Sequence, residues 1–416
     1  MNNNKKKKVL IVGASAKEYA LAKYFAENDQ IEEVYAAPGN EACEEFAKRI
    51  DIRETAVSEL LEFVIKNDID LTVACSADSI RADIATDFRE NSQLIFAPDA
   101  ESANFATSRS SAKKFLYKLH IPTPKFGVFE KSQLALDYLK NATYPLLITT
   151  DFDRENDVRT VCNNITQAQT CINDIFAQDN NKAVIEEYQY GHPFTFYVIT
   201  DGYQAIPLGI VGDYKFREDG DAGLFTLGMG AFLPDYKISG EQVTNIMDRI
   251  INPILKALQS RQKPYVGIFG IEGVLKNDSA ITVTGITPFL KDHDAQAVIK
   301  SIGCDLYNLF EACVNGYFAD DYDDIPIKDL SIISCVLYSR KDKAVVTGLE
   351  LADDTTDIGY FATSKNKFFE VLTNPGRTIV VTQSSATLTR AKELLYDNIE
   401  NIYFDGIKYR HDICSE

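Results

Sequence analysis

The sequence predicts a multi-domain α/β protein whose N-terminal part is a doubly wound parallel sheet. Its 416 residues can form several hydrophobic cores, so three or four structural units are expected. A short apolar run at 9–12 enters a turn at Gly13, and 19–26 then reads as a helix. The same alternation continues, which is the pattern of parallel βαβ units. The further strands are expected at 33–37, 71–75 and 94–96, with a helix at 58–66.

The turn at Gly13 argues against a dinucleotide site. Such a site needs G-x-G-x-x-G, because its glycines let the backbone approach a pyrophosphate. Here Gly13 stands alone, and Ser15 and Ala16 occupy the later positions. We therefore expect no NAD role for this turn.

A smaller unit is expected after a helical stretch over 100–120 that ends at Ile-Pro-Thr-Pro, residues 121–124. Its predicted elements are strands at 146–149, 159–162 and 183–187 and a helix at 167–178. The next unit combines strands at 195–200, 205–211, 266–275 and 280–286 with helices at 240–261, 294–302 and 306–314.

An acidic run at 320–324 reads as a solvated linker to a last unit, because it lacks the spacing of a calcium loop. That last unit is expected to hold strands at 332–338, 344–349 and 378–382 and a helix at 388–395. The predicted domain limits are therefore 1–120, 121–190, 191–325 and 326–416.

The composition argues against several classes of partner. The formal net charge of −18 repels nucleic acid and anionic membranes, so neither is expected to bind. No apolar run is long enough to cross a bilayer, and no signal-peptide core follows the polar opening residues. The eight cysteines are scattered without metal-binding spacing, which favours reduced thiols in a cytoplasmic protein.

The stretch 221–234 carries the main functional signal. We expect it to be a loop in which Gly223, Gly228 and Gly230 allow positive φ angles and present backbone N–H groups to an anion. A Gly-containing connection between strands would explain the glycines equally well. Two charged residues, Asp213 and Lys215, lie just upstream and favour a binding role.

Asp213-Tyr-Lys215, followed by Asp221-x-Gly-x-x-Thr-x-Gly-Met-Gly-Ala-Phe-x-Pro, resembles the signature of the phosphoribosylamine–glycine ligase family. The resemblance extends over nearly the whole chain, through motifs at 9–13, 37–40, 69–72, 95–98, 121–123, 184–187 and 410–413. It implies an ATP-grasp core with a small lid domain and an α+β C-terminal domain. It also implies a magnesium- and ATP-dependent reaction of purine biosynthesis that joins glycine to 5-phosphoribosylamine.

The resemblance also implies a set of site residues. Arg109 would face the ATP phosphates, and the strand end Glu186-Glu187 would contact adenine, although two acids at a solvated strand end are an equally good interpretation. The residues implied for substrate binding are Pro38, Gly39, Asn40, Asp213, Lys215, Asp221, Gly223, Thr226, Gly228, Met229, Gly230 and Asp292. A tight turn explains Pro38-Gly39-Asn40 equally well.

The chain departs from the family on the nucleotide side. Residues 149–157 lack the glycines and lysines of the family's flap and hold four acids, with Arg154 as the only cation there. Gly285 and Thr287 replace the family's two magnesium ligands, so no metal ligand is assigned. Glu272 is the one acid that could restore a metal site, and His293 is expected to be solvated at a helix start.

Three functional interpretations remain. The first is a homologue that keeps the scaffold but has lost or weakened ATP turnover, because the substitutions concentrate on the nucleotide and metal positions. The second is a working ligase with a rearranged ATP and metal site, which would need ATP and magnesium. The third is a module that binds a phosphorylated metabolite or a protein partner.

Overall fold

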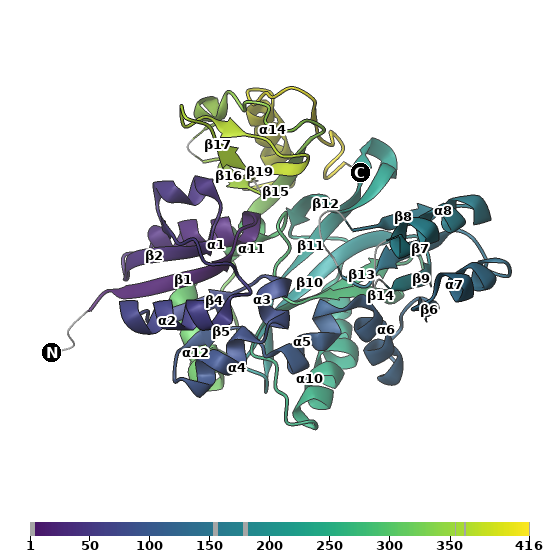
Figure 1. The fold of residues 1–416 in the computed structure, drawn as a ribbon, viewed down its shortest axis with the longest axis horizontal. Helices are drawn as coiled ribbons and strands as arrows, with labels where there is room; N and C mark the ends of the chain where they lie inside the picture. Colours follow the sequence, from purple (N-terminus) through teal and green to yellow (C-terminus); the bar gives the residue numbers. More distant parts are fainter. Residues whose placement is uncertain (1–4, 153–156, 178–181, 354, 362, 416) are drawn as a thin grey trace.

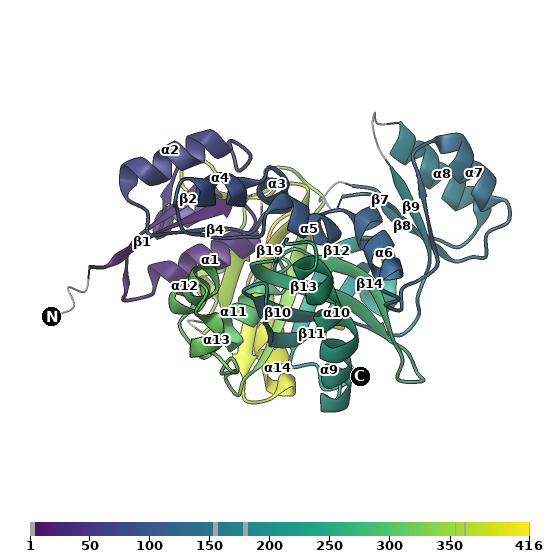
Figure 2. The ribbon, with the colours of Figure 1, turned by 90° about the horizontal axis from the view of Figure 1, so that it is seen from below.

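The chain forms three main β-sheets with helices packed between and around them. The computed structural model describes residues 5–152, 157–177, 182–353, 355–361 and 363–415. Figures 1 and 2 show the N-terminal sheet on one side, the small sheet on the opposite side, and the largest sheet between them. Over the described residues, no helix is long and apolar enough to cross a membrane.

The N-terminal sheet confirms the predicted parallel, doubly wound architecture. Its strands lie in the order β3-β2-β1-β4-β5 and pair in parallel throughout. Alternate residues of β1 face opposite sides: Ile11 packs in the core that includes helix α1, and Val12 in the core that includes α2 and α4. The bounds are β1 Lys7–Gly13, α1 Ala16–Ala26, β2 Ile31–Pro38, β3 Lys48–Arg49, α2 Val57–Asn67, β4 Leu71–Ala74, α3 Ala77–Arg81, α4 Ile84–Glu90 and β5 Ile95–Phe96.

The expectation of a single helix over 100–120 is wrong, because the chain forms two helices there. Helix α5 (Ala100–Thr107) ends before Ser108, whose backbone is extended, with φ −135° and ψ 122°. The hydroxyl of Ser108 accepts a hydrogen bond from the backbone N–H of Ser111 and so caps helix α6 (Arg109–Lys118).

The small sheet is antiparallel in the order β6-β9-β7-β8, with two helices on it that enclose a separate core. Its elements are β6 Phe126–Phe129, α7 Ser132–Leu139, β7 Leu146–Thr150, β8 Arg159–Cys162, α8 Ile165–Phe176 and β9 Ala183–Glu187. The three predicted strands and the predicted helix are all present, and the structure adds strand β6 and helix α7 to them.

The largest sheet continues from the central part of the chain into the C-terminal part. Its order is β14-β13-β10-β11-β12-β15-β19-β16, with β20 paired to β15. Gly230 of β12 pairs with Cys335 of β15, so the two parts share one sheet. The bounds are β10 His192–Thr200, β11 Ala205–Glu218, β12 Ala222–Leu233, β13 Gly267–Leu275, β14 Ile281–Thr287, β15 Ser331–Ser339, β16 Asp357–Tyr360, β19 Gly376–Ser385 and β20 Ile407–Lys408.

Two further expectations about this region are wrong. The helix expected over 240–261 is interrupted by a π-helical turn at Met247–Ile251, next to Pro253, which cannot donate a backbone hydrogen bond. No strand forms at 344–349, where Gly348 takes a left-handed conformation with φ +81°. The remaining elements are α9 Gly240–Ile246, α10 Asn252–Gln259, α11 Ala295–Ser301, α12 Leu306–Asn315, α13 Phe318–Asp321, β17 Ser364–Lys365, β18 Val371–Leu372 and α14 Leu388–Ile399.

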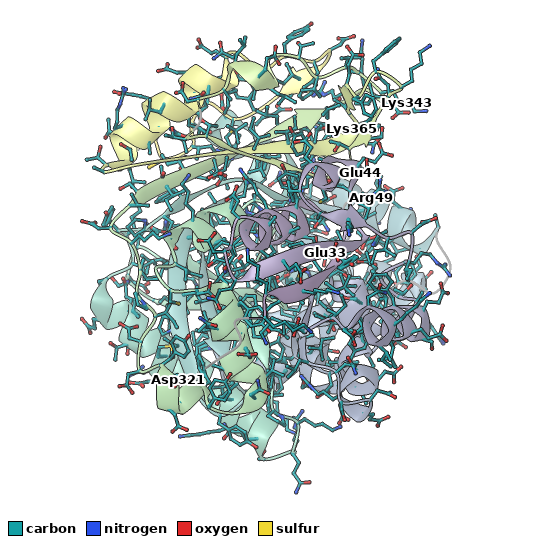
Figure 3. The ribbon with its side chains drawn as sticks, turned by 90° about the vertical axis from the view of Figure 1, so that its left-hand side faces the viewer. Glu33, Glu44, Arg49, Asp321, Lys343 and Lys365 are labelled. Atoms are coloured by element: carbon teal, nitrogen blue, oxygen red, sulfur yellow. The ribbon has the colours of Figure 1, made fainter. Side chains whose placement is uncertain are left out.

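Side-chain contacts join these parts to one another. Phe96 of β5 stacks on Phe310 of α12, with ring centroids 4.0 Å apart and planes 4° from parallel. Lys365 of β17 lies above the N-terminal part in Figure 3, and its ammonium donates to Glu45 over 3.0 Å. These contacts hold the N-terminal part against helix α12 and against the C-terminal part.

Candidate active site

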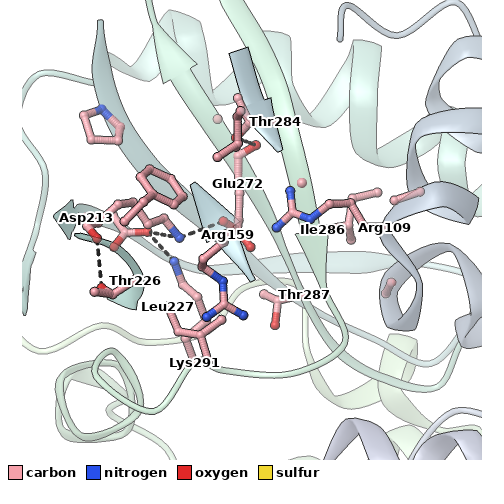
Figure 4. A pocket seen from close by; sticks show the side chains of 18 of the residues that line it. Arg109, Arg159, Asp213, Thr226, Leu227, Glu272, Thr284, Ile286, Thr287 and Lys291 are labelled. Carbon is pink, nitrogen blue, oxygen red and sulfur yellow. Dashed lines mark hydrogen bonds and ion pairs between the residues drawn. The ribbon is translucent and has the colours of Figure 1, made fainter. Parts of the chain in front are cut away.

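A cleft enclosing about 1670 Å³, its open mouth included, lies where the N-terminal part, the small sheet and the largest sheet meet. Figure 4 shows part of its lining, with side chains from several elements directed into it. Among the described residues, its charged lining consists of seven cations and seven acids. The cations are Lys17, Arg81, Arg109, Arg159, Lys215, Lys291 and Arg377, and the acids are Asp151, Glu186, Glu187, Asp213, Asp221, Glu272 and Asp292.

Asp213 and Lys215, on strand β11, both line this cleft. The Lys215 ammonium lies 2.9 Å from the Asp213 carboxylate and 2.7 Å from that of Glu272 on β13. Lys291, which follows β14, forms an ion pair with the same Asp213 carboxylate (Figure 4). Burial opposes ionisation of Asp213, but Lys215, Lys291 and His293 hold the pKa of its carboxyl well below the usual range.

The expectation that His293 is solvated is wrong. Its side chain is fully buried, and its Nε2 lies 3.0 Å from the Asp213 carboxylate and 3.0 Å from that of Asp294. The Asp294 carboxylate also accepts a hydrogen bond from the Tyr197 hydroxyl over 2.5 Å. His293 therefore belongs to the framework that fixes Asp213.

Asp292 connects three distant parts of the chain. Its carboxylate accepts a 2.5 Å hydrogen bond from the Ser15 hydroxyl and lies 3.5 Å from the Lys17 ammonium and 3.3 Å from the Arg377 guanidinium. Burial opposes ionisation, but Lys17 and Arg377 lower the pKa of Asp292. The turn after Gly13 thus contributes to the cleft through Ser15 and Lys17.

The strand end Glu186-Glu187 also lines the cleft, but the two acids differ in their environment. Glu186 is buried, which contradicts the alternative of two solvated acids, and it forms ion pairs with Lys113 and, over 3.4 Å, with Arg109. Glu187 is partly exposed and lies 3.4 Å from Lys125. Arg109 thus reaches the cleft from the first turn of α6.

The stretch 221–234 is mostly strand β12, so the expectation of an irregular loop is wrong. Gly228 has φ +140°, and a Cβ there would lie 1.9 Å from the His293 ring. A Cβ on Gly230 would lie 2.5 Å from Ile413, and one on Gly223 would lie 2.9 Å from Glu218. These glycines therefore permit close packing against neighbouring side chains.

The other predicted residues of this stretch divide between the cleft and the core. Thr226 lines the cleft, and its hydroxyl donates to the Lys215 carbonyl over 2.8 Å. Asp221 also lines it and accepts a 2.8 Å hydrogen bond from the Arg410 guanidinium. The side chain of Met229 is buried in a core with Ala16 and Val336.

The predicted loop Pro38-Gly39-Asn40 combines the local contacts of a tight turn with one hydrogen bond to the C-terminal part. Gly39 has φ +60°, and the Asn40 side chain accepts from the Ala42 N–H over 3.0 Å and donates to the Tyr360 carbonyl over 3.0 Å. Its role in substrate binding stays a prediction.

The residues of the cleft do not fit a magnesium ion. Gly285 supplies no side chain, and the nearest acid, Glu272, is paired with Lys215. Over the described residues, no cluster of three or more His, Cys, Asp or Glu side chains is arranged to hold a metal. The flap residue Arg154 lies outside the described residues.

Several cleft cations were not predicted from the sequence. Lys17, Arg81, Arg159, Lys291 and Arg377 all line the cleft. Lys17 follows the Gly13 turn, which was considered above only as a dinucleotide site and rejected as one. The sequence carries no signal for the other four cations, because only the fold brings them together.

Comparison with known proteins identifies the family. Models of the phosphoribosylglycinamide synthetase N domain, ATP-grasp (A) domain and C domain match residues 7–105, 107–293 and 338–416. The phosphoribosylamine–glycine ligase of Clostridium acetobutylicum is 31% identical over 415 residues, covering 98% of this chain and 99% of that protein.

Solved structures show the same fold. The phosphoribosylamine–glycine ligase of Thermotoga maritima superposes with a TM-score of 0.80 at 20% identity, covering 98% of this chain and 100% of the other. A biotin carboxylase domain of Hydrogenobacter thermophilus, solved with MgADP, reaches a TM-score of 0.70 at 12% identity, covering 97% and 91% of the two chains. With all three domain models matched in order, the chain belongs to the phosphoribosylamine–glycine ligase family of ATP-grasp proteins.

Proposed function

We propose that this chain binds the phosphorylated ligands of the phosphoribosylamine–glycine ligases of purine biosynthesis and that its ATP-dependent step is impaired. In the family reaction, ATP phosphorylates the glycine carboxylate, and the amine of 5-phosphoribosylamine then attacks the acyl carbon. A C–N bond forms, and the C–O bond to the leaving phosphate breaks. No side-chain nucleophile takes part, so the protein contributes binding, orientation and charge stabilisation.

The ion-paired series Glu272–Lys215–Asp213–Lys291 is the observation that carries the proposal. Phosphoryl transfer from ATP requires cations that offset charge on the transferred group, and magnesium normally supplies much of that charge. Here the carboxylates of Glu272 and Asp213 already have ammonium partners. On the neighbouring strand β14, Gly285 has no side chain and Thr287 has no carboxylate.

Binding of a phosphorylated metabolite does not need that chemistry. Lys17 and Arg377 line the cleft and both contact Asp292. A phosphate monoester could take hydrogen bonds from the same two cations, because it presents three acceptor oxygens. The expected ligand is therefore a ribose phosphate ester such as glycinamide ribonucleotide.

A working ligase is the second candidate, and the strand end at Glu186 favours it. Glu186 is anchored between Lys113 and Arg109, and the strand end around it lines the cleft where the family contacts adenine. A nucleotide base that contacts backbone atoms there would tolerate the changed side chains. ATP and magnesium would then be required as cofactors.

Calorimetric titration with MgATP and, separately, with glycinamide ribonucleotide tests the proposal, together with an assay for glycine-dependent release of phosphate. We expect binding of the ribonucleotide and no measurable turnover. Lys17→Ala is expected to weaken ribonucleotide binding about tenfold or more, the effect of losing a charged hydrogen bond. Lys300→Ala is the matched control, since Lys300 pairs with Asp357 outside the cleft.

Turnover at a rate typical of ATP-dependent ligases would refute the impairment and favour the second candidate. Binding of neither compound would refute the proposal as a whole. That result would leave a protein-partner role, the third interpretation from the sequence, as the remaining function to test.

A further inference from the structure

Lys291 occupies a central position among the acids of the cleft. Its ammonium forms an ion pair with Asp213, lies 3.6 Å from the Asp294 carboxylate and donates to the Thr195 hydroxyl over 2.7 Å. Only 11% of the side chain is exposed. Burial alone would lower the pKa of Lys291, but Asp213, Asp294 and Glu272 raise it, so the side chain is a permanent cation at neutral pH.

The ammonium of Lys215 continues this arrangement on the other side of Asp213. It bridges Asp213 and Glu272 over 2.9 and 2.7 Å. Two lysines thus alternate with three carboxylates in the order Glu272, Lys215, Asp213, Lys291 and Asp294. Figure 4 shows Lys291, Asp213 and Glu272 directed toward the same part of the cleft.

A divalent cation at this place would meet strong opposition. Magnesium needs about six oxygen ligands in close, near-octahedral contact. A magnesium ion placed beside the ammonium groups of Lys215 and Lys291 would be repelled by both, and because these side chains are largely buried, water screens that repulsion only weakly. The neighbouring strand β14 offers no compensating acid here, since the residue paired with Glu272 is Gly285, which has no side chain, and Thr287 carries no carboxylate.

We propose that the tethered ammonium of Lys291 takes the place of a divalent cation in this cleft, so that the protein binds its anionic ligand without metal. This inference rests on the proposed binding of a phosphorylated ligand at the same site. It adds a property that the binding proposal does not require, because a ligand could also bind there together with a metal ion. Lys291 neutralises the carboxylates that would otherwise attract a divalent ion.

The first test is a gain of metal binding. Full-length Lys291→Ala, titrated with Mn²⁺ and followed by the electron paramagnetic resonance of free Mn²⁺, is expected to bind one ion at least tenfold more tightly than the unaltered protein. Adding Glu272→Gln should remove the gain, because it takes away one of the three carboxylates of this series. Lys300→Ala is the control. Lys300 and Lys23 both pair with Asp357 outside the cleft, so removing the Lys300 ammonium leaves Asp357 paired with Lys23 and should create no metal site.

The second test needs no variant. Glycinamide ribonucleotide is titrated into the unaltered protein under two conditions. About 1 mM EDTA removes divalent metal, and about 5 mM Mg²⁺ supplies it. Equal affinities within about twofold support the inference. A tenfold or greater loss in EDTA overturns it and leaves the proposed binding function intact.

The two proposals therefore fail separately. If the ribonucleotide binds under neither condition, the proposed function fails, and the Mn²⁺ titration still decides the role of Lys291. If folded Lys291→Ala gains no Mn²⁺ binding, Lys291 is only a structural ion-pair partner, and the inference is wrong.

Discussion

Gly228 is a position where one added methyl group should cost considerable stability. A Cβ there would lie 1.9 Å from Cε1 of His293, about 1.5 Å inside ordinary van der Waals contact. The His293 ring is fully buried and 3.0 Å from Asp213, so moving it away breaks that contact. Loss of a charged hydrogen bond costs about 1.5–3 kcal/mol, and alanine at φ +140° adds about 1–3 kcal/mol of strain.

Gly228→Ala is therefore expected to destabilise the protein by about 3–5 kcal/mol. Gly220→Ala is the matched control, because Gly220 also has a positive φ, +66°, but a Cβ there meets nothing within 4 Å. The control should lose only about 1–2 kcal/mol of backbone energy. The difference between the two variants reports the contact with His293 together with any difference in backbone strain between φ +140° and φ +66°.

Scanning calorimetry is the suitable assay, since the chain contains no tryptophan for fluorescence. An unfolding entropy of about 2 cal/mol/K per residue gives roughly 1 °C of Tm shift per kcal/mol for a chain of this length. The Tm should fall by about 3–5 °C in Gly228→Ala and about 1–2 °C in Gly220→Ala. Equal shifts in the two variants would refute the assigned contact.

Three further changes probe the rest of the fold. Lys113→Met leaves the buried Glu186 carboxylate without its ammonium and should cost about 3–5 kcal/mol, and adding Glu186→Gln should recover part of that loss in urea unfolding. Phe310→Ala removes the stacked ring between the N-terminal part and α12 and should cost about 3–5 kcal/mol, whereas Phe369→Ala, at an exposed ring, should change the free energy of unfolding by no more than about 0.5 kcal/mol. Burial opposes ionisation of Asp412, but its hydrogen bonds lower its pKa to about 2, so its contribution is complete above pH 4 and lost as the pH falls through 2. The stability difference between the unaltered protein and Asp412→Asn should shrink over that window, and a difference that stays constant from pH 5 to 2 would contradict this assignment.

The N-terminal architecture was predictable because its signal is local. Val9, Ile11 and their neighbours form an apolar run, and a strand buried on both faces requires such a run. The break at Ser108 was less visible, since serine is tolerated inside helices and only its capping contact with Ser111 distinguishes it.

Strand β12 was missed because glycine hides the alternation that identifies strands. Gly228 and Gly230 contribute no side chain, so the sequence reads as a loop. What makes it a strand is pairing with β11 and with β15, which lies a hundred residues further along the chain. The burial of His293 was missed for the same reason, because its partner Asp213 is 80 residues away.

The balance of charge in the cleft limits what can bind there. Seven cations and seven acids line it among the described residues, and contacts such as Lys215 with Glu272 and Lys17 with Asp292 already pair several of them. An anionic ligand gains little from a neutral cleft unless it displaces a carboxylate from its cation. Ligand binding should therefore be accompanied by movement of an acid such as Asp292 toward solvent. The net free energy of binding is then the difference between two similar sets of charged hydrogen bonds, those of the cations to the ligand and those of the same cations to the displaced carboxylate. A phosphate monoester matches that exchange, because its oxygens can replace those of one carboxylate, whereas a triphosphate brings more negative charge than the tethered cations can offset.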